Sequence, residues 1–174
     1  LVAPASADVI GKIANGIADD MLTTTIMACK CPKLISPAMN TNMFTNPIVQ
    51  DNLKKLEHYG YEIIQPDSGY LACGDTGAGK MPSEQVLLNY ILMTLAKDKD
   101  MAGIKLTVTA GPTRDKLDPV RFLSNNSTGK MGYAIAKMAM LRGADVTLVS
   151  GKVSLEPVPF VKMVDIVSAE DMYN

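Results

Sequence analysis

The glycine-rich stretch around Cys73 contains a residue type that can do chemistry. It reads Leu71-Ala-Cys-Gly-Asp75, with further polar residues on the C-terminal side of the thiol. A thiol in such a place can give up a proton as a general acid. A free cysteine is also commonly a small core residue, and the spacing alone leaves both interpretations open.

The same stretch imitates a nucleotide-binding P-loop. Residues 74–80 read Gly-Asp-Thr-Gly-Ala-Gly-Lys and satisfy the Gly-x4-Gly-Lys part of that motif. The next residue should be Ser or Thr, whose hydroxyl holds magnesium, but it is Met81. Pro82 follows, and a proline there disfavours a helix that begins at Lys80. A P-loop needs that helix, because its N-terminal amides bind the phosphate. The sequence therefore favours a flexible flap that carries a thiol and a cation.

Two asparagines follow a predicted strand in the segment Pro37-Ala-Met-Asn-Thr-Asn-Met-Phe44. The C-terminal ends of parallel strands are where α/β folds bind ligands. A carboxamide there can donate and accept hydrogen bonds, which suits a carboxylate or amide ligand. The alternative is an asparagine-capped turn ahead of the helix at Pro47, and the residues alone favour that alternative.

Two segments of small residues in the second half of the chain suit an anion. Ala110-Gly-Pro-Thr-Arg114 directly follows a predicted strand, and Ser124-Asn-Asn-Ser-Thr-Gly-Lys130 directly precedes a predicted helix. Small residues let a ligand approach the backbone. Free amides at the helix start, with Arg121 and Lys130 nearby, favour a nucleotide phosphate. Ordinary helix capping by Ser127 or its neighbour is the alternative.

Periodic patterns predict the elements that position these segments. Apolar spacing indicates helices over 9–27 (capped by Ser6 or Asp8), 47–58, 83–96 and 130–142, and strands over 33–36, 61–64, 105–109, 145–149 and 161–167. A last helix is capped by Ser168. Residues 66–82 lack periodicity and are predicted to form one long loop. Strands that alternate with helices indicate a parallel α/β sheet, and the second half forms a βαβ module. The charged stretch 98–103 is predicted to link two domains, residues 1–97 and 104–174.

Composition and charge narrow the class of protein. The 174 residues are 47% hydrophobic and 20% charged, which is a globular composition. The net charge of −1 gives no general attraction to nucleic acid, and the apolar runs are too short for a membrane span. Three cysteines and one histidine build neither a secreted disulfide framework nor a four-ligand zinc site, so we expect a cytoplasmic protein without a metal centre. The chain opens on the tail of a strand without Met, so we expect a fragment.

Taken together, these segments resemble one family, the bifunctional phosphopantothenoylcysteine decarboxylase/phosphopantothenate–cysteine ligases of coenzyme A biosynthesis. The matching segments keep the family's order through nearly the whole chain: residues 4–8, 11–20, 37–44, 71–81, 109–114, 118–121 and 124–132. Residues 37–44 are similar to the signature Pro-x-Met-Asn-x-x-Met-Trp, with Phe44 as the aromatic residue, and Lys80 stands where arginine is more common.

The resemblance implies two Rossmann-like α/β domains, both partial: the C-terminal part of a flavin-dependent decarboxylase (1–97) and the N-terminal part of a CTP-dependent ligase (104–174). It implies that FMN oxidises the cysteinyl moiety of 4′-phosphopantothenoylcysteine, that carbon dioxide leaves, and that Cys73 donates the proton that completes 4′-phosphopantetheine. In the ligase, CTP with Mg²⁺ would activate phosphopantothenate as an acyl-cytidylate, which cysteine attacks. The family also suggests a homo-oligomer.

The resemblance also implies roles for individual residues. The catalytic residues would be Cys73 and Asn125, and Asn40 would hold the substrate carboxylate. The substrate-binding residues implied are Asn40, Met43, Ala72, Lys80, Met81 and Arg121. The residues implied to contact FMN are Pro4, Ala5, Ser6 and Asp20, and those implied to bind CTP are Gly111, Thr113, Ser127, Gly129 and Lys130.

Two departures from the family limit what this chain is expected to do alone. The family's decarboxylase histidine belongs to a segment before Leu1, and His58 does not match it. The catalytic lysine of the ligase belongs to a later segment, and Lys130 is not that residue. We therefore expect the chain to catalyse neither complete reaction, and its parent to catalyse both. The alternative is a non-catalytic flavin- or nucleotide-binding regulatory module, which would have no need of Asn40 and Cys73 together.

Overall fold

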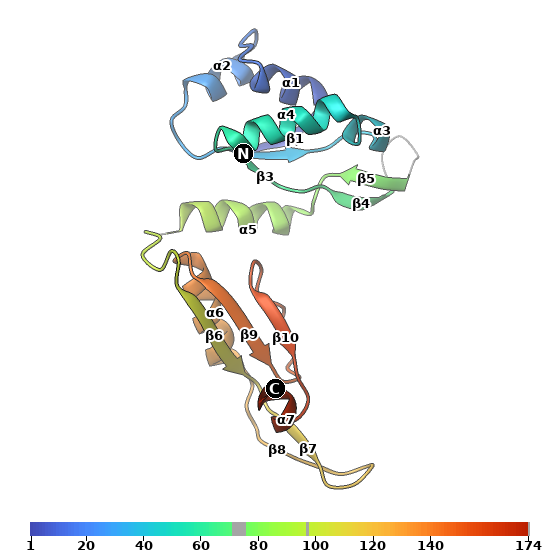
Figure 1. The fold of residues 1–174 in the computed structure, drawn as a ribbon, viewed down its shortest axis with the longest axis vertical. Helices are drawn as coiled ribbons and strands as arrows, with labels where there is room; N and C mark the ends of the chain where they lie inside the picture. The colour runs from blue at the N-terminus through green and yellow to red at the C-terminus, as the bar shows by residue number, and fades with distance from the viewer. Residues whose placement is uncertain (71–75, 97, 174) are drawn as a thin grey trace. The chain divides into compact units, whose positions relative to one another are not determined.

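The computed structural model describes residues 1–70, 76–96 and 98–173, and Figure 1 shows their helices and strands. They form two compact units, Leu1–Thr94 and Leu95–Asn174, each with its own parallel sheet. The predicted α/β class with parallel sheets is confirmed. Among the described residues, no helix is both long and apolar enough to cross a bilayer.

The first unit is built on a three-stranded parallel sheet in the order β1-β2-β3. Its strands are β1 (Val2–Ala5), β2 (Leu34–Pro37) and β3 (Glu62–Ile63). Its helices are α1 (Ala7–Ala14), α2 (Met21–Ala28), α3 (Thr41–Phe44), α4 (Pro47–His58) and α5 (Glu84–Leu95). Helices α1 and α4 cover one face of the sheet, and α5 covers the other (Figure 1).

Strand β2 is central because its residues serve both faces. Ile35 is fully buried in the cluster made with α1 and α4, which includes Ile10 and Leu56. Leu34 packs instead against Ile64 and Leu87 of α5. Successive side chains of a strand point to opposite faces, so a run of apolar residues is required wherever both faces are covered.

The prediction of one helix over residues 9–27 is wrong, because two helices share that stretch. Helix α1 begins at its N-cap Ser6, as predicted, and ends at Asn15, before Gly16 with a φ of +70°. Helix α2 starts afresh at Asp20, whose carboxylate accepts from the Thr23 N–H at 2.7 Å. The reciprocal capping box fixes this second start, which the apolar spacing through the region conceals.

The prediction of one long loop over residues 66–82 is also wrong. Strands β4 (Asp67–Tyr70) and β5 (Thr76–Lys80) pair antiparallel, with Gly69 opposite Gly77. Glycine and polar residues have low strand propensity, so local composition hides a hairpin that pairing stabilises. Lys80 ends a strand and the next helix begins at Glu84, so Lys80 does not lead into a helix as a P-loop lysine does.

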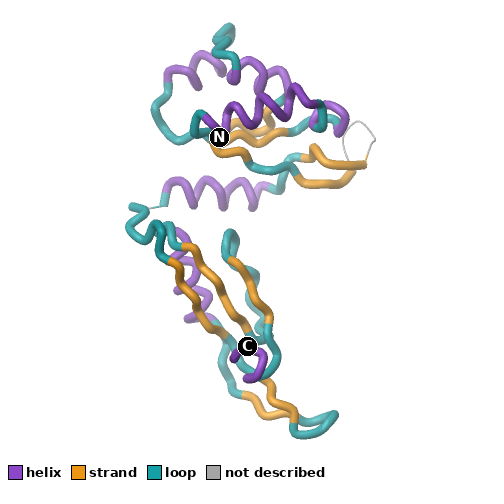
Figure 2. Tube along the Cα trace, viewed as in Figure 1, coloured by secondary structure: helices purple, strands orange, loops and turns teal. Residues whose placement is uncertain are grey.

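The second unit contains a three-stranded parallel sheet in the order β10-β9-β6, drawn in orange in Figure 2. The strands are β6 (Lys105–Ala110), β9 (Asp145–Ser150) and β10 (Lys162–Asp165). Helix α6 (Lys130–Leu141) connects β6 to β9, as the predicted βαβ module requires. A hairpin that the sequence patterns did not predict, β7 (Arg114–Lys116) and β8 (Phe122–Ser124), precedes α6, and α7 (Ala169–Tyr173) follows β10.

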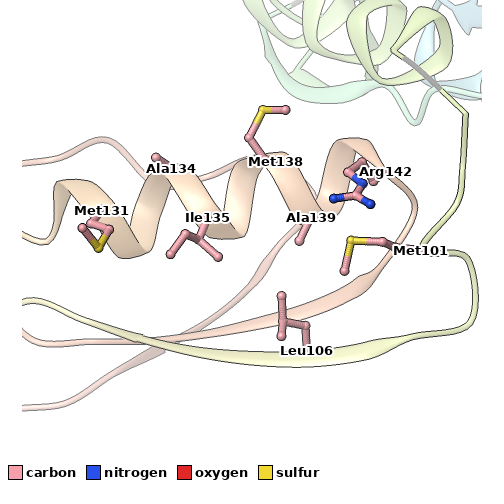
Figure 3. Close-up of a pocket in the computed structure, with 8 residues that line it drawn as sticks. All are labelled: Met101, Leu106, Met131, Ala134, Ile135, Met138, Ala139 and Arg142. Atoms are coloured by element: carbon pink, nitrogen blue, oxygen red, sulfur yellow. The ribbon is translucent and has the colours of Figure 1, made fainter.

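Helix α6 packs on one face of this sheet through small and apolar side chains. Ala136 is fully buried and Ala139 nearly so. Figure 3 shows Ile135 and Ala139 on the side of α6 that faces Leu106 of β6, where they line an apolar groove of about 390 Å³. The segment before β6 is hydrogen-bonded to the C-terminal end of α6, because the Met101 N–H donates to the Arg142 carbonyl at 3.0 Å.

Candidate functional site

The first candidate site begins where β1 and β2 end side by side. Ala5 pairs with Pro37, and the Ala38 N–H donates to the Ala5 carbonyl at 3.1 Å. Directly after β1, the Ser6 hydroxyl accepts from the Val9 N–H at 3.3 Å and caps α1. The Pro4–Ser6 segment at the end of β1 and the Pro37–Phe44 segment therefore meet at the carboxyl edge of the sheet, the usual ligand-binding edge in this class of fold.

The β4–β5 hairpin docks on that same edge. The Met39 N–H donates to the Gly79 carbonyl at 3.0 Å. Gly79 has a φ of +126°, and a Cβ atom placed on it would lie 2.2 Å from the Met39 carbonyl oxygen. Only glycine allows both this backbone conformation and this approach. The contact brings Lys80, the next residue, to the edge that holds Met39 and Asn40.

Asn40 is held in a defined orientation by a local hydrogen bond. Its Oδ1 accepts from the Asn42 N–H at 2.8 Å, and it is the N-cap of α3. The alternative predicted from the sequence, an asparagine-capped turn, is therefore present in the structure. The same bond fixes the plane of the carboxamide, whose nitrogen is the donor that an asparagine uses toward a carboxylate.

The other substrate-binding and catalytic residues that the resemblance implies for the decarboxylase differ in exposure, and two of them are not described by the structure. Cys73 and Ala72 lie outside the described residues. Met43 is exposed, and Lys80 is exposed at the end of β5. Met81 packs against the cluster of Leu34, Ile64 and Leu87, which gives its side chain a role in the core.

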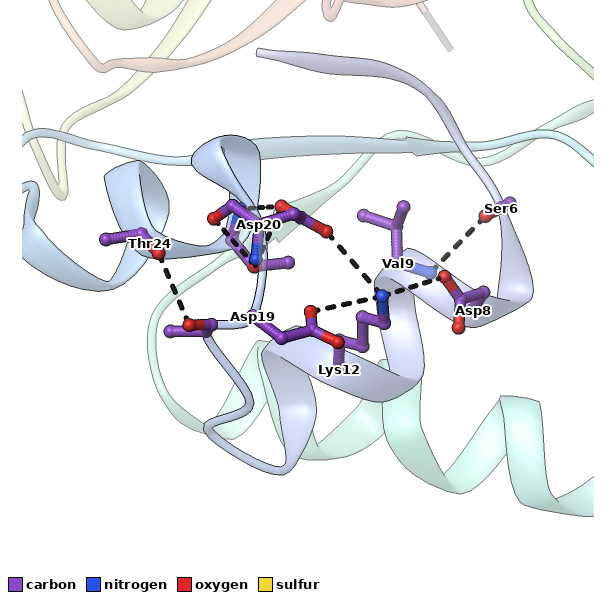
Figure 4. A network of polar contacts seen from close by, with 9 residues as sticks. Ser6, Asp8, Val9, Lys12, Asp19, Asp20 and Thr24 are labelled. Carbon is purple, nitrogen blue, oxygen red and sulfur yellow. Dashed lines mark hydrogen bonds and ion pairs between the residues drawn. The ribbon is translucent and has the colours of Figure 1, made fainter.

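Asp20 lies in a polar cluster around Lys12, which Figure 4 shows. The Lys12 Nζ is 3.5 Å from Asp8, 3.1 Å from Asp19 and 3.6 Å from Asp20. Hydrogen bonds from the Thr23 backbone and hydroxyl, with a smaller contribution from Lys12, hold the pKa of Asp20 below its usual value. The carboxylate thus already has partners that keep it ionised.

The lowered pKa of Asp20 predicts a specific pH dependence of stability. Its folded pKa lies below the unfolded one, so its contribution is complete above about pH 4 and is lost as pH falls through the folded pKa. Asp20→Asn keeps an N-cap acceptor but removes the charge. We expect this variant to melt lower than wild type at neutral pH, with a gap that narrows below about pH 4. Thermal melts across this range check the expectation, with Asp51→Asn at an exposed position of α4 as the control; a constant gap would contradict it.

The second candidate site is a pocket of about 280 Å³ between the end of β6 and the start of α6. Four of the predicted nucleotide-binding residues line it: Gly111, Ser127, Gly129 and Lys130. Gly129 is the N-cap of the twelve-residue α6 and makes no side-chain cap hydrogen bond. The N-cap residue is thus Gly129 and not Ser127 or Thr128, although the Ser127 hydroxyl accepts from the Gly129 N–H at 3.4 Å. Residues 129–132 at this helix start line the pocket, a place where helix amides can bind an anion.

The other predicted ligase residues, Asn125, Thr113 and Arg121, do not line this pocket. The Asn125 Oδ1 accepts from the Ser127 N–H at 2.9 Å, which orders the turn before α6. The Thr113 carbonyl accepts from the Ser124 hydroxyl at 2.8 Å, so its backbone ties the two strands of the β7–β8 hairpin. Arg121 precedes β8 and pairs with Asp118, with its side chain 76% exposed. Arg121 and Thr113 are not among the residues that line the pocket.

Gly151 packs behind Gly111 of this site, and the sequence patterns did not single it out. It follows β9, and a Cβ atom on it would lie 1.9 Å from the Pro112 carbonyl oxygen. The same region holds Gly111, whose Cβ position is 2.9 Å from the Gly151 carbonyl oxygen. A glycine close after the end of a predicted strand, two residues beyond position 149, is the signal that could have identified it.

We expect Gly151→Ala to destabilise the second unit by about 2–3 kcal/mol, since the added methyl group overlaps a backbone oxygen that cannot move freely. Gly103→Ala is the control for an alanine without overlap: no atom lies within 4 Å of the new Cβ, although the φ of +81° itself disfavours a side chain. That change should cost only about 1 kcal/mol. Urea unfolding monitored by circular dichroism checks the order of the two variants, and equal losses would contradict the overlap.

A family model described as "Flavoprotein" matches residues 1–96, more than half of the chain. The chain belongs to the flavoprotein family. A second model, "DNA/pantothenate metabolism flavoprotein C-terminal domain", matches residues 101–174 of this flavoprotein.

Curated relatives match this flavoprotein along almost its whole length. It is 47% identical over 175 residues to the "Coenzyme A biosynthesis bifunctional protein CoaBC" of Bacillus subtilis (strain 168), covering 99% of this chain and 43% of that protein. The protein of the same name from Escherichia coli (strain K12) is 45% identical over 172 residues, covering 99% and 42%. The flavoprotein therefore spans about two fifths of the length of these relatives.

A solved structure is similar to part of the flavoprotein. It is a PPC decarboxylase mutant complexed with pantothenoylaminoethenethiol, 38% identical, with a TM-score of 0.50. The similarity covers 51% of this chain and 50% of that one.

Proposed function

We propose that this flavoprotein is part of a coenzyme A biosynthesis enzyme, with residues 1–97 in an FMN-dependent phosphopantothenoylcysteine decarboxylase domain and 104–174 in a CTP-dependent phosphopantothenate–cysteine ligase domain joined by residues 98–103. Relatives named for coenzyme A biosynthesis match along 99% of the chain. The observation that carries the decarboxylase proposal is the junction of the Pro4–Ser6 turn, the Pro37–Phe44 segment and the β4–β5 hairpin, joined by backbone hydrogen bonds.

The first unit offers surroundings that fit a flavin at this edge. The Pro4–Ser6 segment ends β1 and leads into α1, at the edge where open α/β sheets bind cofactors. The Ser36 hydroxyl is buried at the end of β2 and has no hydrogen-bond partner among the described residues. FMN, when bound, would supply the two-electron oxidation of the cysteinyl group. Pro4, Ala5 and Ser6 would contact it, and Asp20 would support the neighbouring α2 start.

The chain's own residues then bind the substrate and handle one proton. Asn40 would donate from its carboxamide to the substrate carboxylate, and Lys80 would add a positive charge at the same edge. Cys73 would release its thiol proton to the product and so act as the general acid. Met43, Met81 and Ala72 would contact the substrate beside them.

In the second unit, CTP with Mg²⁺ would bind at the pocket between β6 and α6. Gly111 and Gly129 leave the backbone accessible, and Lys130 and Ser127 provide a charge and a hydroxyl for a phosphate. Asn125, Arg121 and Thr113 would complete the ligase site. The uncapped start of α6 supports this proposal, because its N–H groups need an acceptor.

The decisive test uses the full-length protein with phosphopantothenoylcysteine and FMN. We expect decarboxylated product from wild type and a loss of at least about 100-fold in rate for Cys73→Ser, since a hydroxyl is a much weaker acid than a thiol. Cys31→Ser, an exposed thiol elsewhere in the unit, is the control and should retain full activity. Flavin and CTP binding without product would favour a non-catalytic regulatory module, and product at the wild-type rate from Cys73→Ser would refute the proton-donor role.

A further inference from the structure

Thr41, the first residue of α3, has a hydroxyl whose surroundings call for explanation. Its Oγ1 is buried and makes no conventional hydrogen bond to any part of the chain that the structure describes. Buried hydroxyls in proteins are nearly always paired. The side chain therefore lies where it does for a reason other than a hydrogen bond of the usual kind.

Gly77 of β5 supplies that reason. A Cβ atom on Gly77 would lie 2.5 Å from Thr41 Oγ1, 3.0 Å from Cγ2 and 3.3 Å from the Thr41 Cβ. In glycine only a hydrogen occupies this direction, so the strand can approach Thr41 Oγ1 closely. The threonine and the strand could not come this close with any other residue at position 77.

The same arrangement recurs two residues further along β5. The Cβ direction of Gly79 points at the Met39 carbonyl oxygen, 2.2 Å away, while the Met39 N–H donates to the Gly79 carbonyl. Asn40 lies between Met39 and Thr41 in the chain. Both residues that flank Asn40 are thus in close contact with the hairpin, and these contacts fix the distance between β5 and the Asn40 turn.

We propose that Thr41 is a positioning residue that, through Gly77, sets the approach of the β4–β5 hairpin to Asn40 and so governs the capture of a carboxylate substrate. The proposal rests on the proposed function, because it takes Asn40 as the residue that holds the substrate. Thr41 acts through its neighbours and is not a catalytic residue. Its loss should therefore weaken binding and leave the chemical step nearly unchanged.

A double-mutant cycle in the full-length protein tests this coupling. Gly77→Ala should raise KM for phosphopantothenoylcysteine about tenfold and leave kcat within about threefold of wild type. Thr41→Ala should raise KM only about threefold, and the double variant should return to that level, because alanine at 41 removes the Oγ1 and Cγ2 that the new methyl group meets. Thr41→Ser retains the oxygen and should behave as wild type.

Gly69→Ala is the matched control. Gly69 lies directly opposite Gly77 on β4, and its Cβ would meet only the flexible Lys80 side chain, at 3.5 Å. This variant carries the same glycine-to-alanine change in the same hairpin, so it should show the wild-type KM.

Amide hydrogen exchange at Met39 gives a readout that does not depend on activity. Its N–H donates to Gly79, so Gly77→Ala should speed its exchange about tenfold and the double variant should restore protection. Wild-type protein that forms no decarboxylated product would defeat the proposed function, while this exchange cycle would still support the contact. The proposal is overturned if Gly77→Ala matches Gly69→Ala in both KM and exchange, or if the double variant is as impaired as Gly77→Ala.

Discussion

Replacing Asn40 with aspartate is expected to lower kcat/KM for phosphopantothenoylcysteine decarboxylation by at least about 100-fold. Aspartate keeps the oxygen that accepts from the Asn42 N–H, so the turn before α3 remains. It replaces the donor nitrogen with a second negative oxygen, which would face the carboxylate that the substrate must place there. The loss should therefore come from electrostatic repulsion and not from unfolding.

Asn46→Asp is a close control for this change. Asn46 caps α4 in the same way, since its Oδ1 accepts from the Ile48 N–H two residues on, at 2.9 Å. Steady-state kinetics and thermal melts on both variants of the full-length protein separate the two effects. If Asn40→Asp keeps activity within about threefold of Asn46→Asp, Asn40 does not hold the substrate carboxylate.

Gly79→Ala is the second change with a large expected effect. The methyl group would lie 2.2 Å from the Met39 carbonyl oxygen, on a backbone whose φ of +126° already disfavours a side chain. Overlap and backbone strain together should destabilise the first unit by about 3 kcal/mol. The hairpin can relieve the overlap only by leaving Met39, so decarboxylation should fall by at least about tenfold.

Gly60→Ala separates these two contributions. Gly60 also has a positive φ, +82°, but no atom lies within 4 Å of its Cβ position. Denaturant unfolding should therefore show a loss of only about 1 kcal/mol for Gly60→Ala, with activity retained. Equal destabilisation in the two variants would mean that the hairpin does not rest on Met39 as described.

The sequence predicted elements best where a local signal marks both of their ends. Helix α4 has Asn46 and Pro47 at its start and Gly60 after its end, and its predicted bounds are confirmed. Apolar spacing predicts a single helix across α1 and α2, because Ile17 and Met21 continue that spacing through the gap between them. The Asp20 capping box with Thr23 was the signal that separates them.

The candidate sites were predicted only in part, because contacts between distant segments leave no mark on local patterns. The turn residues at Asn40 and Gly129 could be located from their place after a strand or before a helix. The hairpin pairing of β4 with β5 could not, since its strands are formed largely of glycine and polar residues. Thr41 gave no signal at all, because its role depends on a glycine 36 positions later in the chain.

The close contacts at Gly79 and Gly151 have a consequence for how relatives of this flavoprotein can diverge. A glycine with positive φ and open space around it, as at Gly60 and Gly103, can drift to asparagine, which tolerates that backbone conformation. A glycine in contact with a carbonyl oxygen has no such tolerated substitution, since every other residue adds a Cβ atom that overlaps the oxygen. Selection on these two positions should therefore act on the presence of a single carbon, whatever the chemistry of the residue that carries it.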